Sequence, residues 1–284
     1  MTATLNRVTA TLHQPTDDLA GTPRLTGMKV TQRRVIKSEW TKFRSLRSTK
    51  ITLLVAVALT VGLGALISGV TASHWASSPG GHAGFNAVVT SLEGVTMAQL
   101  VVGVLGVLLL SGEYSTGMIR ASLTAVPSRL PVLWGKLTVL SGVVGIASIA
   151  SAFAAFFIGQ SLLSSQHLQV SISSPHALQM VFGAGVYMTL VAIIGMALGG
   201  LLRNTAAGIS SLVAMFFVIP PLMNLLPSSW ANHIGPYLPS NAGEALWGHP
   251  SGTHLSAAAG LGVLCLWAAA VVGAAAFRLK RQDG

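Results

Sequence analysis

ITLLVAVALTVGLGALISGV, residues 51–70, is a run of twenty residues without a charged side chain. An α-helix of about 20 predominantly apolar residues is long enough to cross a hydrocarbon core about 30 Å thick. Because lipid offers no hydrogen-bond partner to the backbone, such a run must satisfy its own polar groups as a helix. The stretch therefore predicts a membrane-spanning helix.

The composition of the rest of the chain agrees with this reading. Of its 284 residues 51% are hydrophobic and only 8% are charged, whereas soluble domains usually carry about 25% charged residues. Its mean hydropathy is +0.67. These values exclude an ordinary soluble domain and indicate a membrane protein.

Five further apolar runs resemble the first, and none of the six contains Asp, Glu, Lys, Arg or His. The spans are predicted at residues 51–70, 94–111, 137–158, 178–202, 205–226 and 255–277. We therefore expect an all-α membrane protein whose six transmembrane helices form one domain over residues 51–281. Pro220 and Pro221 lack an N–H group, so they should kink or end the fifth span.

The basic residues all fall in alternate loops. Of the 17 Lys and Arg, ten lie in residues 1–50, three in the 112–136 loop, one at Arg203 and three after residue 277. Residues 71–93, 159–177 and 227–254 contain none. Because cytoplasmic loops are enriched in Lys and Arg, both termini and the 112–136 loop are predicted to be cytoplasmic. The net charge of +10 is then a topology signal, although a DNA-binding arm is the alternative for the N-terminal part.

Residues 31–50 are both basic and amphipathic. At 100° per residue, five apolar side chains share one face of a helix, and they are Val35, Ile36, Trp40, Phe43 and Leu46. This pattern predicts a helix lying in the inner membrane surface, with a solvated charge run as the alternative. Residues 1–30 are polar and predict a disordered cytoplasmic tail, unless Met28 is the true start.

Motifs for soluble-enzyme chemistry are missing from the sequence. There is no G-x-x-x-x-G-K-[ST] phosphate loop, no H-E-x-x-H and no G-x-S-x-G. Seven histidines lie in the predicted outer loops without close metal-ligand spacing, so only a zinc site assembled from several loops is conceivable. The single cysteine, Cys265, excludes an internal disulfide and is expected to be a small buried residue. No catalytic, cofactor-binding or metal-binding residue is predicted.

The loop after the second span reads SGEYSTGMIRASLTAVPSRLPVLWGK, residues 111–136. Its small polar and apolar residues around Met118 and Ile119 can form a short helix, and Pro127 and Pro131 follow. From composition alone it is either a connector or a partner-binding segment.

Three stretches together resemble permeases of the ABC-2 transporter family of the actinobacterial type. They are SEWTKFRSLRST (38–49), the 111–136 loop, and YLPSNAGEAL (237–246), and the resemblance extends over residues 30–281. It implies six spans, a cytoplasmic interfacial helix, and a coupling helix between spans two and three that docks on a separate ATPase. ATP and Mg²⁺ would bind to that ATPase and not to this chain. Two permease copies would pair, with a homodimer favoured over a heterodimer.

The resemblance also implies roles for particular residues. The ATPase-coupling segment would comprise Glu113, Tyr114, Ser115, Thr116, Gly117, Met118, Ile119 and Arg120. The interfacial helix would add a second contact around Glu39, Trp40, Lys42, Phe43 and Arg44. Residues 227–254 would form an outer re-entrant connection anchored at the membrane interface by Trp230, Tyr237 and Trp247.

The function that follows is an ATP-driven exporter in a bacterial cell membrane. When the ATPase closes, a lipid, hydrophobic peptide or drug would move outward, and the chain itself would do no covalent chemistry. The alternatives are a partner-binding or signalling membrane protein without transport, an intramembrane enzyme, and a complex in which the ATPase acts on a protein partner.

Overall fold

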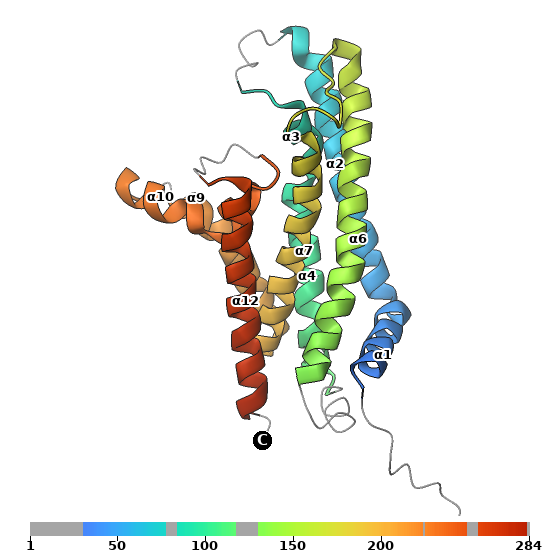
Figure 1. The fold of residues 1–284 in the computed structure, drawn as a ribbon, viewed down its shortest axis with the longest axis vertical. Coiled ribbons are helices and arrows are strands. Elements are labelled where there is room, and N and C mark those ends of the chain that lie inside the picture. The colour runs from blue at the N-terminus through green and yellow to red at the C-terminus, as the bar shows by residue number, and fades with distance from the viewer. Residues whose placement is uncertain (1–30, 78–83, 118–129, 224, 249–254, 283–284) are drawn as a thin grey trace, which may run out of the picture.

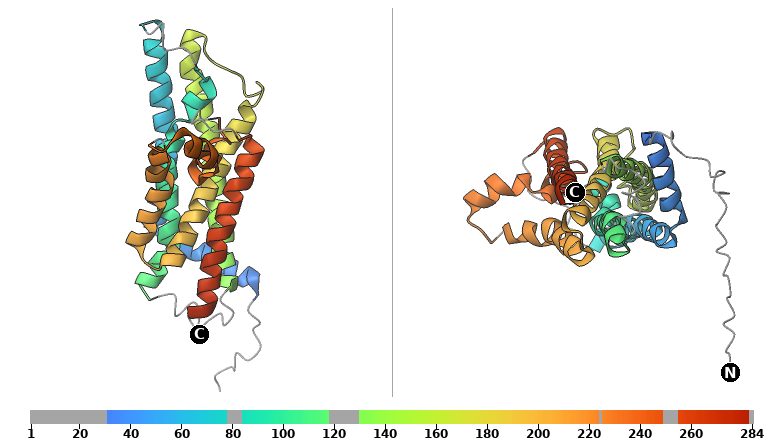
Figure 2. Two further views of the ribbon diagram at one scale, coloured as in Figure 1. Left: turned by 90° about the vertical axis from the view of Figure 1, so that its left-hand side faces the viewer. Right: turned by 90° about the horizontal axis from the view of Figure 1, so that it is seen from below.

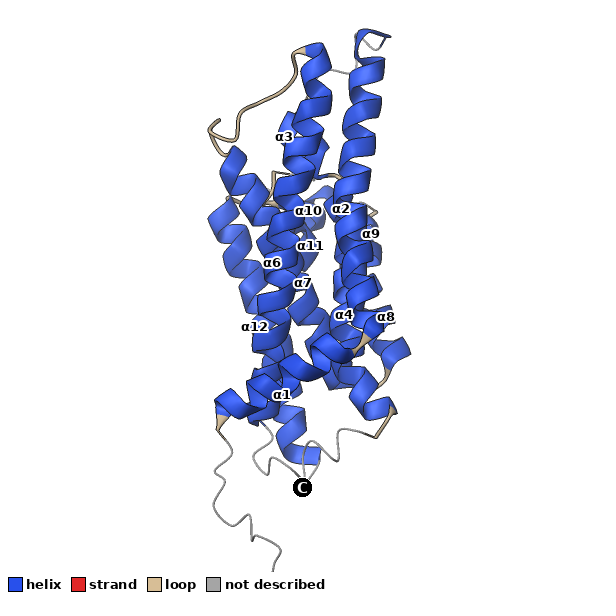
Figure 3. Ribbon diagram, turned by 90° about the vertical axis from the view of Figure 1, so that its right-hand side faces the viewer, coloured by secondary structure: helices blue, strands red, loops and turns tan. Residues whose placement is uncertain are grey.

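The computed structural model describes residues 31–77, 84–117, 130–223, 225–248 and 255–282. These residues contain helices and connecting segments but no strand (Figure 3). The predicted tail at 1–30 lies outside the described residues, as does the centre of the predicted coupling loop.

Fifteen helical segments follow one another along the described part of the chain. They are α1 (Gln32–Ser45), α2 (Arg47–His74), η1 (Trp75–Ser77), α3 (Ala87–Leu92), α4 (Gly94–Ser115), α6 (Leu130–Leu163), η2 (Ser164–Gln166), α7 (Ala177–Leu202), α8 (Thr205–Val213), η3 (Ala214–Val218), α9 (Ile219–Met223), α10 (Ser228–Ile234), η4 (Gly235–Tyr237), α11 (Pro239–Glu244) and α12 (Ala257–Gln282) (Figure 1).

Among the described residues, six helical stretches are long and apolar enough to cross a membrane. They are Arg47–Ser77, Ala87–Ser115, Leu130–Gln166, Ala177–Leu202, Thr205–Met223 and Ala257–Arg281. The prediction of an all-α, six-span membrane protein is confirmed. The sequence underestimated several lengths, because helices continue past the apolar run into polar residues. The 34 residues of α6 extend about 51 Å at 1.5 Å per residue, well beyond a hydrocarbon core of about 30 Å.

Helix α7 occupies the centre of the bundle. It packs against α4, α6 and α12, and 72% of its apolar window is buried. Close approach of α4 and α7 depends on glycine: a Cβ added to Gly195 would overlap the carbonyl of Gly103, and one added to Gly106 would overlap the carbonyl of Ala192. Small residues at such crossings let backbones meet in lipid, where no hydrophobic effect drives helices together.

The remaining spans are peripheral. The windows of α2, the fifth span and α12 are only 22%, 17% and 22% buried. Seen along the bundle from below, α1 lies on one flank, while α9 and α10 extend from the opposite flank (Figure 2). Most of the surface of these spans is therefore available to lipid or to another chain.

The fifth span is irregular at its second half. A five-residue π-helical segment, Ala214–Val218, separates α8 from the short helix α9. Pro220 and Pro221 follow, so the carbonyls one turn earlier lose their usual N–H donors, and local π geometry is a common accommodation. The helix ends at Met223, which agrees with the expected effect of the prolines.

The connection between α9 and α12 consists of short helices: α10 extends away from the bundle, whereas α11 packs against α12 and α7 (Figure 1). Gly243 of α11 lies against the ring of the fully buried Tyr187, and Trp267 Nε1 donates a hydrogen bond to the carbonyl of Tyr237 at 3.0 Å. Figure 1 shows this connection below the upper ends of α2 and α6. Residues 249–254 lie outside the described residues.

Two sequence expectations for individual side chains need correction. Trp230 and Tyr237 are 60% and 55% exposed, as interfacial anchors would be, but Trp247 is 1% exposed. Trp247 is packed inside the protein, because the chain after α11 folds inward, so its side chain cannot reach a lipid interface. Cys265 is exposed on α12 and not buried, because that face of the helix has no protein neighbour.

We expect Gly195→Ala to lower the melting temperature of the purified protein, corresponding to about 1–3 kcal/mol of destabilisation from overpacking. The added methyl would press on the backbone of Gly103. Gly142→Ala is the matched control, since a Cβ there meets nothing within 4 Å. Equal melting temperatures for the two variants would contradict the glycine-mediated packing of α4 on α7.

Candidate functional site

Helix α1 is docked on the start of α6. Val35 and Phe43 are 5% and 6% exposed. A Cβ on Gly135 would come within 2.9 Å of Val35 Cγ1, so this glycine makes room for α1. Gln32 Nε2 also donates to the carbonyl of Pro131 at 3.1 Å. Helix α1 is therefore held by protein contacts as well as by any contact with lipid.

The apolar face of α1 is thus shared between two environments, which differs from the single lipid-facing stripe expected from the sequence. Val35 and Phe43 face the protein, whereas Trp40 and Leu46 are each 49% exposed. The helical period identified the face correctly. It could not show that α6 covers half of it, because that depends on tertiary packing.

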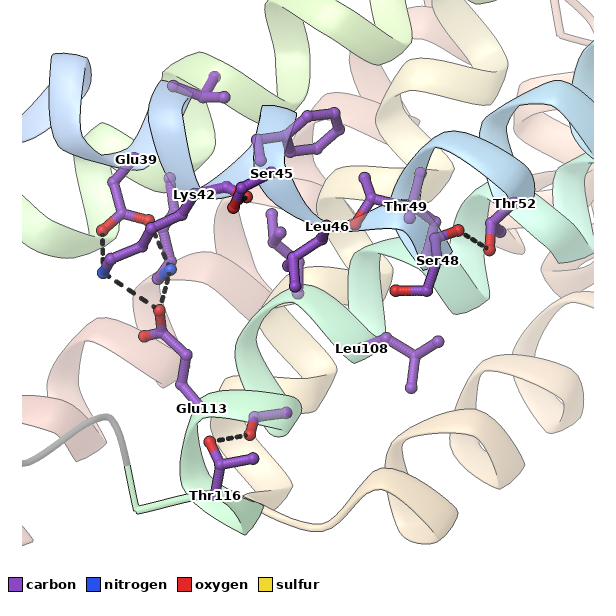
Figure 4. A pocket seen from close by; sticks show the side chains of 16 residues that line it. Glu39, Lys42, Ser45, Leu46, Ser48, Thr49, Thr52, Leu108, Glu113 and Thr116 are labelled. Carbon is purple, nitrogen blue, oxygen red and sulfur yellow. Dashed lines mark hydrogen bonds and ion pairs between the residues drawn. The ribbon is translucent and has the colours of Figure 1, made fainter.

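Four charged side chains from three helices meet beneath α1 (Figure 4). Lys136 Nζ of α6 lies 2.6 Å from Glu39 Oε2 of α1 and 2.7 Å from Glu113 Oε1 of α4. Lys42 Nζ of α1 lies 2.8 Å from Glu39 Oε1 and 3.4 Å from Glu113 Oε1. We call these four residues the charge cluster. Two lysines and two glutamates alternate around it, so its charges balance.

Burial makes this pairing obligatory. Lys136, Glu39 and Glu113 are 2%, 5% and 8% exposed, and an ion removed from water without a partner costs several kcal/mol. The side chain of Lys42 remains 33% exposed. Lys42 therefore forms the edge of the charge cluster and Lys136 its centre.

The pKa of Lys42 is raised above its ordinary value. Burial acts against its positive charge, but the hydrogen bond to Glu39 and the negative charges of Glu113 and Glu39 outweigh that effect. A raised lysine pKa means that the stabilising contribution is fully present at neutral pH and is lost only as pH rises through the raised value.

A partly open cavity of about 490 Å³ lies among α1, α2, α4 and α6, and the charge cluster forms part of its lining. Most of its wall surface is apolar. Figure 4 shows Glu39, Lys42 and Glu113 on one side of it and Leu46, Thr49 and Leu108 on the other. The second carboxylate oxygen of Glu113 is buried without a hydrogen-bond partner among the described residues. The cavity thus offers apolar walls with a polar end.

The residues just after Glu113 complete the end of α4. Tyr114 lies under the guanidinium of Arg203, 5.0 Å from the ring centroid, which joins α4 to the turn between α7 and α8. The hydroxyls of Ser115 and Thr116 donate to the carbonyl of Gly112 at 3.0 and 2.8 Å. Gly117 has a φ of +71°, a conformation that favours glycine where a helix ends.

The structure brings together two groups of residues that the sequence treated as separate contacts. Glu39 and Lys42 of the interfacial group pair directly or through Lys136 with Glu113 of the coupling group. Trp40 and Arg44 lie on the exposed side of α1. Met118, Ile119 and Arg120 lie outside the described residues, so the predicted coupling helix itself is not described.

Lys136 is the residue that sequence reasoning missed. From the sequence it is one of three basic residues in the 112–136 loop and contributes only to the topology signal, because the apolar runs stop at Ser111 and resume at Leu137. In the structure α4 continues to Ser115 and α6 begins at Leu130, so both Glu113 and Lys136 lie within helices. One acid, Glu113, follows the second apolar run, and one base, Lys136, precedes the third. That pairing of opposite charges is the sequence signal that could have predicted their ion pair.

No model of a known protein family matches the chain, and a search of curated proteins found no match. Among the described residues there is no group of three or more His, Cys, Asp or Glu side chains placed to hold a metal ion.

We expect Lys136→Met to destabilise the protein by about 3–5 kcal/mol, because it leaves two buried carboxylates with only Lys42 as a partner. The double variant Glu113→Gln/Lys136→Met removes one charge of each sign and should recover part of the loss. Thermal unfolding in detergent measures both effects. Lys37→Met is the control, since Lys37 is exposed on the same helix; an equal loss there would rule out a specific role for the charge cluster.

Proposed function

We propose that this chain is the membrane-spanning permease subunit of an ATP-driven exporter of the ABC-2 type. A separate ATPase would bind ATP and Mg²⁺ and close around them. Its movement would be passed to this chain at the basic end of the bundle, where α1, the end of α4, the start of α6 and the end of α12 lie. The chain would contribute transport and no covalent chemistry of its own.

The observation that carries this proposal is the charge cluster. It ties α1 to α4 and α6, the two helices that flank residues 116–129. A force on that loop would therefore act on three helices together, because separating them exposes or isolates buried charges. An ordinary connector has no need of such bracing, whereas a segment that receives a mechanical input does.

The surface around the charge cluster suits a docking partner. Trp40 and Arg44 on α1 and Ser115–Gly117 at the end of α4 are exposed at the same end of the bundle. These residues belong to the two segments that the sequence resemblance assigned to ATPase contact. On this proposal Glu39, Lys42, Phe43 and Glu113 act from beneath as positioning residues.

The substrate would be hydrophobic: a lipid, peptide or drug. The six apolar runs contain no acid or base. Glu113 and Lys136 lie beyond those runs, at the basic ends of the longer helices, and are paired with each other. The apolar runs therefore offer no relay group for an ion-coupled carrier, and energy from a separate ATPase is the simpler source. The exposed faces of the peripheral spans leave room for a second permease copy, and a homodimer is the assembly that we propose.

The deciding experiment co-expresses this chain with a candidate ABC ATPase and measures ATPase activity in vesicles. We expect Glu113→Gln and Met118→Asp to reduce substrate-stimulated turnover by about fivefold or more, the size of a typical coupling free energy. Ser165→Asp, an exposed position at the opposite end of the bundle, should leave turnover unchanged.

Two outcomes would contradict this proposal. If no ATPase co-purifies with the wild-type chain, the alternative of a partner-binding membrane protein without transport is favoured. If the ATPase binds but Glu113→Gln and Met118→Asp both turn over like wild type, the loop after α4 does not couple the two proteins.

The orientation has its own test. In a Cys265→Ser background, an impermeant thiol reagent added to intact cells should label Ser165→Cys but not Ser115→Cys, because the basic end is proposed to be cytoplasmic. Both positions are exposed in the structure. The reverse labelling pattern would place the ATPase contact on the wrong side of the membrane.

A further inference from the structure

The chain bends sharply between α1 and α2, and two hollows meet at the bend. Leu46 is the one residue between α1 and α2, and its backbone is extended. One hollow is the apolar cavity of about 490 Å³. The other, of about 350 Å³, is lined by Trp40, Thr41, Arg44, Ser45 and Lys50. Ser45 lines both hollows, so they border the same bend, and a ligand with two chemically different parts would place one part in each.

The outer hollow carries unbalanced positive charge. Arg44 and Lys50, which line it, are exposed, and no ion pair within the described residues involves them. The sequence contains no acid from residue 40 to residue 92. The nearby carboxylates of Glu39 and Glu113 are already engaged in the charge cluster. An anion is therefore the natural occupant of this site, since each basic side chain near an anionic lipid surface contributes about 1 kcal/mol.

Away from the charge cluster, the wall of the inner hollow suits an apolar ligand. Its volume lies within the roughly 300–1,000 Å³ of small-molecule sites, and its wall is mostly apolar. Leu46 and Leu108, which line it, are 49% and 41% exposed. Large aliphatic side chains left open beside a positively charged hollow indicate a ligand with an acyl chain.

We propose that an anionic phospholipid binds at the α1–α2 bend, with its phosphate between Arg44 and Lys50 and one acyl chain in the inner cavity. Trp40, 49% exposed beside the outer hollow, suits the head-group level of a membrane. The inference requires only that the chain spans a membrane, so it does not depend on the proposed transport role. A free phosphate would leave the inner cavity unfilled, and a zwitterionic lipid would leave the basic charges unbalanced.

The test titrates the delipidated full-length chain in mild detergent and counts bound lipid by native mass spectrometry. The probes are phosphatidylglycerol, phosphatidylcholine with the same acyl chains, and glycerol phosphate, which has the head-group chemistry without the tails. Phosphatidylglycerol should bind at least about tenfold more tightly than either other probe, since one or two basic contacts and the apolar tail each add affinity.

Matched variants separate the two halves of the site. Arg44→Gln/Lys50→Gln should weaken phosphatidylglycerol binding by about 30-fold, from two basic contacts. Arg33→Gln/Arg34→Gln removes the same charge from α1 outside both hollows and should have little effect. Leu108→Trp should block the inner cavity and weaken binding, whereas Leu54→Trp, on the exposed face of α2 outside the cavity, should not.

Four results would overturn the proposal. If phosphatidylcholine bound as tightly as phosphatidylglycerol, the site would have no preference for an anionic head group. If glycerol phosphate bound as tightly as phosphatidylglycerol, the acyl chain would contribute nothing to binding. If Arg44→Gln/Lys50→Gln and Arg33→Gln/Arg34→Gln lost the same affinity for phosphatidylglycerol, binding would reflect general attraction to a basic surface. Unchanged binding in Leu108→Trp would place the acyl chain elsewhere. The melting temperature of each lipid-free variant checks that it is folded.

Discussion

Lys136 cannot be buried in this protein unless Glu39 and Glu113 accompany it. A lone ammonium group withdrawn from water loses hydration worth several kcal/mol, and only carboxylates at 2.6 and 2.7 Å replace it here. The arrangement at the basic end follows from that requirement. Helix α1 must lie against α6, α4 must end where Glu113 can reach inward, and Lys42 closes the edge of the charge cluster beside the solvent.

The centre of the bundle is stabilised by a different principle. Helices α4 and α7 approach through glycines whose missing Cβ atoms let carbonyls and backbones touch, because shape and close packing replace the hydrophobic effect between helices in lipid. The ion pairs of the charge cluster join α1, α4 and α6 at the basic end of the bundle. The proposed ATPase contact and the proposed lipid site both lie at this end, so lipid bound at the α1–α2 bend would be well placed to influence coupling.

The candidate site was only partly accessible from the sequence. The sequence resemblance predicts Glu39 and Lys42 in the interfacial group and Glu113 in the coupling group, as two separate sets of residues. The contact between the two groups could not be predicted from the sequence. The paired residues are separated by 71 and by 97 positions in the chain, and contacts at such separations produce no local periodicity. The missing partner, Lys136, looked like one more positive charge at the edge of a span. Trp247 looked like an interfacial anchor because aromatic residues serve both at interfaces and in cores, and only the inward fold after α11 distinguishes the two uses.

The sequence by itself determined the class of fold: six apolar runs, each long enough to cross a bilayer, have one stable backbone conformation in lipid. It also determined that the basic residues would gather at one end, because alternate loops alone carry them. The helix ends, the division of α1 between protein and exposed surface, the charge cluster and the cavity were decided by tertiary structure. Hydrophobic runs and charge order are local properties of the chain, whereas burial of a charge depends on which distant side chain is there to balance it.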